Sequence, residues 1–175
     1  MGRLGRRCER EVTINEPAFS NGAYIAYPTP KAPRRLKASL KFKPTDTRDG
    51  ILLYCAETDE GHGDFVSLAV RDRHVEFILN VGGRPIVIRS EKELKPGDWH
   101  ILTASRSVSE GRLIVDGETS FGSSPGNHKV LNLLTPLYVG GYDSENMKIN
   151  DRVGVHNSFS GCISEVCLCD SVVRC

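Results

Sequence analysis

The 175-residue sequence predicts an all-β fold, a two-sheet antiparallel sandwich, and three observations support this prediction. Apolar and polar residues alternate along several short segments, which is the period of a strand with one buried and one solvated face. Turn-forming pairs such as Asp49-Gly50 and Asp116-Gly117 separate these segments at short intervals. No segment shows the apolar spacing of an amphipathic crossover helix, so the strands are expected to form two packed sheets.

Individual strands follow from the same alternation. In LKASLKFK, which spans Leu36 to Lys43, every second residue is apolar and the residues between are Lys or Ser, so one face is expected in a core. The only tryptophan, Trp99, is also expected in the core. The other predicted strands are Ile51–Ala56, Asp64–Val70, His74–Val81, Pro85–Ser90, Trp99–Arg106, Arg112–Gly117, Leu137–Gly141 and Phe159–Leu168.

Two stretches lack a strand pattern and are expected to be loops, namely Ser120–Lys129 and Tyr142–Ser158. The second is polar and long for a connection between strands. Loops of such length are commonly either functional or mobile, and the sequence leaves both alternatives open.

Composition limits the class of protein. The chain is 39% hydrophobic and 26% charged, which is typical of a soluble globular domain, and its apolar runs are too short to span a membrane. Because 23 Lys and Arg residues nearly balance 22 Asp and Glu residues, overall charge gives no reason to expect a nucleic-acid partner. The length suits a single domain.

The N-terminus and the cysteines bear on where the protein works. MGRLGRRCER is basic but lacks the apolar stretch of a secretory signal, so the chain is either cytosolic or a fragment of a longer protein. Its six cysteines include no paired motifs at zinc spacing, which favours disulfides in an oxidising compartment. We therefore expect a fragment, without its signal peptide, of a secreted protein.

Six segments, in one order along the chain, carry a more specific signal. They are Asp49–Glu57, Gly63–Gly83, Leu94–Arg106, Gly111–Glu118, Leu131–Gly141 and Phe159–Val166. Together they resemble the laminin G-like domains of the agrin, perlecan, pikachurin and neurexin type. The resemblance implies a jelly-roll, concanavalin-like sandwich over residues 13–175, truncated or altered after residue 166. It also implies that the domain belongs to a protein of the extracellular matrix or cell surface and acts in adhesion and not in catalysis. GRLGRRCE further resembles the end of an EGF-like module, so residues 1–12 are expected to be its tail or a linker.

The resemblance also implies a calcium site. Its matching positions are the side chains of Asp64 and Asn132 and the backbone carbonyls of Val81 and Val130. Asp64 follows a glycine-rich turn, where a carboxylate can lie at the rim of the sandwich without being buried by neighbours. Four protein ligands leave the oxygen shell of Ca²⁺ incomplete, so an acidic group of a partner can complete it. The alternative is that Asp64 only begins a strand and Asn132 only caps a turn.

A second candidate site is basic. It consists of Lys31, Arg34, Arg35, Lys37, Lys41 and Lys43. Strand alternation sends Lys37, Lys41 and Lys43 to one solvent face. Such a row can bind the sulfate or carboxylate groups of heparan sulfate. The alternative is a solvated strand face that protects a sheet edge from aggregation.

Cysteine pairing stays open from the residues alone, because six cysteines allow many pairings. In the family, the cysteine that matches Cys162 pairs with one further along the chain. The resemblance therefore implies that Cys162 either pairs with Cys175 or stays free, while Cys8 belongs to the upstream module. Cys55 is either a disulfide partner or a small buried hydrophobe.

The partners implied by the resemblance are acidic glycans of a dystroglycan-type receptor, heparan sulfate, or protein receptors. Two alternatives are kept: a laminin G-like module that works without metal, and a jelly-roll enzyme that acts on glycans. An enzyme is the weaker alternative, because paired carboxylates such as Glu91 and Glu93 lie in an expected loop and do not face each other across a cleft. Cys55 also lacks a histidine with a recognisable catalytic signature.

Overall fold

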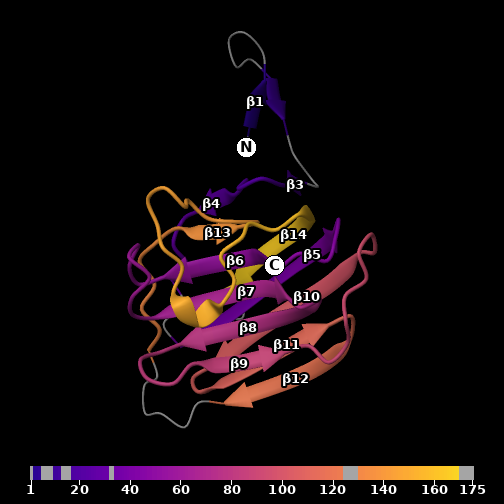
Figure 1. Cartoon of the computed structure of the whole chain (residues 1–175). Helices are drawn as coiled ribbons and strands as arrows, with labels where there is room; N and C mark the ends of the chain where they lie inside the picture. Colours follow the sequence, from indigo (N-terminus) through magenta and orange to yellow (C-terminus); the bar gives the residue numbers. More distant parts are fainter. Residues whose placement is uncertain (1, 5–9, 13–16, 32–33, 124–129, 170–175) are drawn as a thin grey trace.

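The computed structural model is a sandwich of two antiparallel sheets, with a separate short hairpin at the N-terminus (Figure 1). It describes residues 2–4, 10–12, 17–31, 34–123 and 130–169. The hairpin pairs β1 (Gly2–Leu4) with β2 (Arg10–Val12). The assignment of residues 1–12 to an EGF-like module stays a prediction, and Cys8 lies outside the described residues. Within the described part of the chain, no helix has the length and apolar character needed to cross a membrane.

The first sheet has the strand order β12-β11-β10-β5-β14-β3. Its strands are β3 (Ala18–Phe19), β5 (Arg35–Pro44), β10 (His100–Ser107), β11 (Glu110–Val115), β12 (Glu118–Ser123) and β14 (Gly161–Cys169). In the middle of the sheet, β5 pairs with β10 on one side and with β14 on the other. Buried and more exposed residues alternate along β5 and β10, which confirms the predicted strands with one solvated face.

The second sheet has the order β4-β13-β6-β7-β8-β9. Its strands are β4 (Ile25–Tyr27), β6 (Gly50–Ala56), β7 (Phe65–Arg71), β8 (His74–Asn80), β9 (Ile86–Arg89) and β13 (Leu137–Val139). A shift in register between Ile51 and Leu53 lets the consecutive residues Leu52 and Leu53 both enter the core between the sheets. Every residue of β6 is buried, so both faces of this sheet are covered in its middle.

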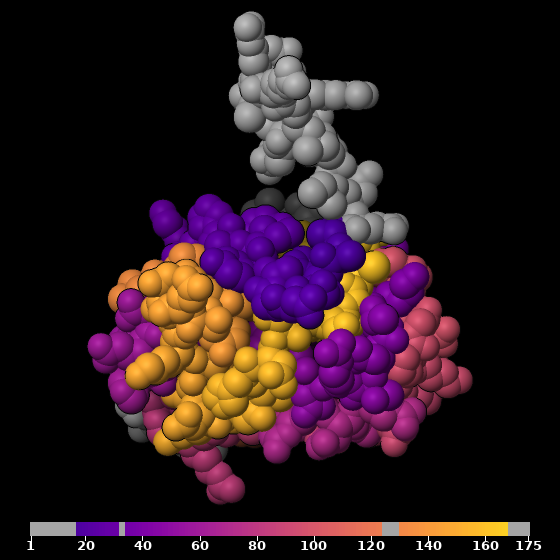
Figure 2. All heavy atoms as spheres, turned by 45° about the horizontal axis from the view of Figure 1, so that its top comes forward, coloured from indigo at the N-terminus to yellow at the C-terminus, as the bar shows by residue number. Residues whose placement is uncertain are grey.

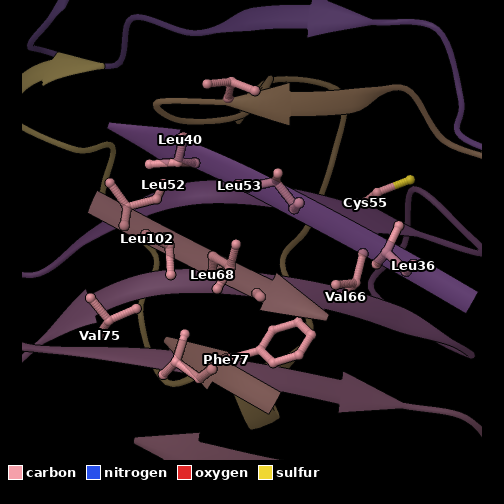
Figure 3. Packing of buried hydrophobic residues seen from close by; sticks show 14 of the residues in the cluster. Leu36, Leu40, Leu52, Leu53, Cys55, Val66, Leu68, Val75, Phe77 and Leu102 are labelled. Atoms are coloured by element: carbon pink, nitrogen blue, oxygen red, sulfur yellow. The ribbon is translucent and has the colours of Figure 1, made fainter. Parts of the chain in front are cut away.

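The main core lies between the two sheets (Figure 3). Leu40 of β5 and Leu102 of β10 face inward from the first sheet, and Leu68 and Phe77 do so from the second. Phe42 is fully buried, and its ring meets the edge of Phe159 with 6.0 Å between ring centres. The inner face of each sheet is covered by the other sheet, so the stability of each depends on this close packing.

A second cluster covers the outer face of the second sheet. The segment 142–158 lays Met147, Ile149, Val153 and Val155 over Tyr54, Phe65 and Ile78. It includes one 3-10 turn, η1 (Asp151–Val153), which is capped by the Asn150 side chain accepting the Arg152 N–H at 3.0 Å. The segment is a loop, as expected, but its buried apolar residues give it a role in packing. That role was missed because these residues are spaced irregularly in a polar stretch.

Two expectations are wrong. Trp99 is 41% exposed, because it precedes β10, in which the inward face begins with the buried His100. His100 is held there by a 2.6 Å contact between its Nδ1 and the Asp116 carboxylate. The predicted loop Ser120–Lys129 begins as part of β12, which continues to Ser123, while residues 124–129 lie outside the described residues.

Candidate functional site

Asp64 lies where the β6–β7 hairpin returns to the second sheet. Two reciprocal hydrogen bonds close this hairpin: the Glu57 N–H donates to the Asp64 carbonyl at 2.8 Å, and the Asp64 N–H donates to the Glu57 carboxylate at 2.9 Å. Gly61 and Gly63 have φ values of 77° and 80°, which few residues other than glycine adopt. The glycine-rich turn thus fixes Asp64 at one end of the sheet.

The Asp64 carboxylate is buried, with the residue only 7% exposed, so the expectation that neighbours leave it uncovered is wrong. The segment around Asn132 packs over it, and the Asn132 N–H donates to its Oδ2 at 3.0 Å. Desolvation raises the pKa of Asp64, and the negative charge of Glu57 raises it further. The backbone N–H groups of Asn132 and Gly82 and the charge of Arg106 act in the opposite direction.

The other predicted calcium-ligating positions lie in two segments that meet Asp64. Val81 immediately precedes Gly82, whose N–H donates to the Asp64 carboxylate. Asn132 belongs to a stretch from Val130 onward in which exposed and buried residues alternate. This stretch is anchored to the end of β6, because the Leu134 and Thr135 N–H groups both donate to the Ala56 carbonyl. Asp64, Asn132 and the Val81–Gly82 turn are therefore brought together, with Val130 two residues before Asn132.

The available groups suit a hard divalent cation. All of them are oxygens, namely one carboxylate, one side-chain amide and backbone carbonyls, which are ligands that Ca²⁺ accepts. The Asn132 side chain is exposed and makes no hydrogen bond to the described residues, so its oxygen is available. Among the described residues, no group of three or more His, Cys, Asp and Glu side chains is arranged to hold a metal ion. An ion at Asp64 would thus depend on one carboxylate, neutral oxygens and the nearby charge of Glu57.

The basic row lies on the outer face of the first sheet. Arg35, Lys37, Lys41 and Lys43 share this face of β5, and the exposed residues Lys31 and Arg34 precede the strand. Since β5 lies between β10 and β14, the alternative that these lysines protect a sheet edge is wrong. Among the residues the structure describes, no segment covers this face in the way that 142–158 covers the second sheet.

The cations of this face differ in their contacts. Lys41 pairs with Glu165 at 2.6 Å, and the Lys43 Nζ lies 5.4 Å from the centre of the Trp99 ring. Within the described chain, Lys37 makes no ion pair or hydrogen bond with its side chain. Arg112 joins the same face, because Ser105 of β10 pairs with Lys37 on one side and with Arg112 on the other. Sequence reasoning missed Arg112, since its position beside Lys37 depends on which strands pair.

The cysteines show two free thiols among the described residues, Cys55 and Cys162. Cys55 is fully buried, donates to the Thr135 carbonyl at 3.3 Å and has its pKa raised to about 11 by burial, so it is a small core residue and not a catalytic thiol. Cys162 pairs across the sheet with Ala18 and Lys43. Its thiol is free, which is one of the two expected alternatives, and Cys175, the partner in the other alternative, lies outside the described residues. Cys167 is disulfide-bonded.

Alkylation of the folded protein with iodoacetamide is expected to label Cys162 well before Cys55. Cys162 is half-buried, whereas Cys55 is covered by the core and its high pKa keeps it protonated at neutral pH. Peptide mapping by mass spectrometry without reduction measures both sites. Equal labelling of the two cysteines, or recovery of Cys162 in a disulfide, would contradict the structure.

Comparison with known proteins adds independent findings. Residues 44–172 match the laminin G domain family. The chain is 33% identical over 165 residues to pikachurin of Bos taurus, covering 93% of this chain and 16% of that protein. It is 37% identical over 169 residues to the basement membrane-specific heparan sulfate proteoglycan core protein of Mus musculus, covering 95% of this chain and 4% of that protein. The chain thus spans a small part of these relatives.

The fold has solved counterparts as well. The mouse laminin alpha1 chain, domains LG4-5, superimposes with a TM-score of 0.77 at 27% identity, covering 89% of this chain and 41% of that one. The LG1-3 region of the laminin alpha2 chain gives a TM-score of 0.74 at 22% identity, covering 91% of this chain and 32% of that one, and supports the fold alone. The jelly-roll sandwich expected from the sequence is confirmed.

Proposed function

The chain belongs to the laminin G domain family, and we propose that it is an extracellular module whose adhesion to acidic glycans or protein receptors depends on calcium. Its family and relatives identify a non-enzymatic binding module of the matrix or cell surface, so the alternative of a glycan-active enzyme is wrong. The observation that supports calcium dependence is the buried Asp64 carboxylate, with Asn132 and the Val81–Gly82 turn arranged around it.

Each residue has a distinct part in this proposal. Asp64 supplies the formal charge, and Asn132 and the carbonyls of Val81 and Val130 supply neutral oxygens. Glu57 adds negative charge beside Asp64 without being needed as a ligand. When bound, Ca²⁺ supplies positive charge that attracts a carboxylate or sulfate of the partner. Asn132 and Val130 are exposed, so in this proposal the group of the partner approaches the ion from their side.

Isothermal titration with Ca²⁺ tests this function. With one charged ligand, the wild type is expected to bind with a dissociation constant of about 10⁻⁴–10⁻³ M. Asn132→Asp should bind more tightly because it adds a second charge to the shell. Binding of the wild type should weaken as the pH falls through the raised pKa of Asp64, since protons then compete with the ion. No calcium binding in either protein would favour the module that works without metal.

The open basic face supports a second candidate function, binding of heparan sulfate. We propose that Lys37, Lys43 and Arg112 carry most of this binding, and that Lys41 contributes less because Glu165 already pairs with it. Arg34 and Arg35 extend the same basic region toward the start of β5. Binding is expected to fall steeply with salt, because contacts between exposed charges are screened.

Heparin chromatography measures this contribution. Changing Lys37, Lys43 and Arg112 together to Ser is expected to abolish retention, whereas Lys41→Ser should lower the eluting salt concentration only slightly. Arg73→Ser is a matched control, because Arg73 pairs with Glu93 and lies outside the face. Unchanged retention of the triple variant, with normal thermal unfolding, would contradict the proposed role of this face.

A further inference from the structure

We propose a second ligand site, a polar pocket that binds a neutral saccharide unit through adjacent hydroxyl groups. The pocket has a volume of about 410 Å³ and is lined by Asn21, Gly22, Arg48, Asp49, Asn157 and Ser158. It lies at the opposite end of β6 from the candidate calcium site, because Asp49 precedes this strand and Glu57 and Asp64 follow it. The site is thus independent of calcium and of the basic sheet face.

Three segments that are distant in the sequence form its walls, and they meet on the face shown in Figure 2. The turn between β3 and β4 holds Asn21 and Gly22 in left-handed conformations, with φ values of 50° and 85°. Gly141 allows this turn to approach Asn157 and Ser158: a Cβ there would lie 2.4 Å from the Ser158 Oγ and 2.7 Å from the Ala23 carbonyl oxygen. The arrangement therefore requires glycine at residue 141.

Hydrogen bonds hold Arg48 and Asp49, the charged residues of the pocket, in place. The Arg48 Nε donates to the Asp46 carboxylate at 2.8 Å, and its Nη2 donates to the Ser160 hydroxyl at 3.1 Å. The Asp72 N–H donates to the Asp49 carboxylate at 2.8 Å. On the third segment, the Asn157 carbonyl accepts the Ile51 N–H at 2.9 Å, so its backbone is fixed to β6. Charged side chains held in this way lose little conformational entropy when a ligand binds.

Several polar groups of the pocket are left for a ligand. The side chains of Asn21, Asn157 and Ser158 make no hydrogen bond to the described residues. Arg48 has five N–H donors, and its contacts in the described chain leave Nη1 unused. Asp49 keeps a carboxylate oxygen that accepts no hydrogen bond in the described part of the chain. Amide, hydroxyl, guanidinium and carboxylate groups together offer both donors and acceptors.

These groups together favour one class of ligand over another. Each sugar hydroxyl both donates and accepts, so adjacent hydroxyls match a wall that offers both kinds of group. An anionic ligand is disfavoured, because Asp46 already pairs with Arg48 and Asp49 adds a second negative charge. The volume lies near the lower end of the roughly 300–1,000 Å³ of small-molecule sites, which suits one or two sugar units.

Nuclear magnetic resonance with ¹⁵N-labelled protein tests the proposal. The probes are the methyl glycosides of galactose, glucose, mannose and N-acetylglucosamine, each added at millimolar concentration with EDTA present to exclude calcium. At least one glycoside is expected to shift the side-chain amide signals of Asn21 and Asn157 and the backbone amide of Gly22. No saturable shift at these groups with any of the four would overturn the proposal.

Variants then test whether the glycoside binds in this pocket or on one of the other surfaces. Asn157→Ala should weaken binding of the active glycoside by at least about tenfold, and its fold should be unaffected because the exposed Asn157 side chain makes no hydrogen bond or ion pair to the described residues. Arg48→Ala should weaken binding as well, provided that its unfolding temperature stays close to the wild type. Arg112→Ala and Asp64→Asn are matched controls expected to bind normally. Equal binding by Asn157→Ala and wild type would overturn the site.

Discussion

Asp64→Asn is expected to raise the unfolding temperature in the absence of calcium and to abolish the stabilisation that calcium gives the wild type. In the wild type, Ca²⁺ at about 100 times its dissociation constant should add about 2.7 kcal/mol to the free energy of unfolding. For a domain of this size, that corresponds to a rise of roughly 5–10 °C in the unfolding temperature. The variant should show none of this rise.

The sign of the calcium-free effect follows from the raised pKa of Asp64. Such a group has a higher pKa in the folded state than in the unfolded state. It stabilises the fold fully when the pH is below its unfolded pKa. This stabilisation is lost as the pH rises through its folded pKa. Above the folded pKa the wild type has lost it, because the buried carboxylate is then ionised although desolvation and the charge of Glu57 oppose its ionisation. Asparagine carries no charge, so the variant does not lose this stability at any pH.

Asparagine also keeps an oxygen that can accept the Asn132 N–H, whereas alanine would leave this partly buried donor without its partner. Differential scanning fluorimetry with EDTA and with Ca²⁺ measures both effects. Asp98→Asn is the matched control, because it removes the same charge from an exposed turn. A calcium-dependent rise in the variant equal to that of the wild type would show that the ion binds elsewhere.

Ile149→Ala is expected to lower the free energy of unfolding by about 2–5 kcal/mol, although Ile149 lies in a loop. The residue is only 4% exposed and packs in the cluster that covers Tyr54 and Phe65 on the outer face of the second sheet. Losing this contact leaves a cavity over the strands and weakens the attachment of the whole segment 142–158.

Urea unfolding measures the change. Val87→Ala is the matched control, since Val87 is 54% exposed and its truncation should change the free energy of unfolding by less than about 0.5 kcal/mol. Hydrogen exchange should also become faster across residues 142–158 in the Ile149 variant. If Ile149→Ala unfolds at the same urea concentration as Val87→Ala, the segment does not contribute to the core.

Much of the fold could be predicted because strand alternation is a local signal. Along β5 the inward positions of Leu36 and Leu40 follow from period-two burial, and the structure confirms them. The segments that matched the family also placed Asp64 and Asn132 as candidates for one site, and the Asn132 N–H does reach the Asp64 carboxylate. Predictions failed where residue type was used in place of alternation: Trp99, expected in the core as a large aromatic residue, lies one residue before β10 and is exposed.

The sequence by itself therefore determined most of the strands, but not β3, β4 or β12, together with the inward and outward faces of β5 and the residue types available for an ion or an anionic glycan. Only the tertiary structure decided which of these residues meet and which are covered. The burial of Asp64 depends on a segment 68 residues away in the chain, and Arg112 lies near Lys37 only because both strands pair with β10. The physical reason is that strand pairing and loop packing are long-range contacts, whereas alternation and turn propensity act between neighbours.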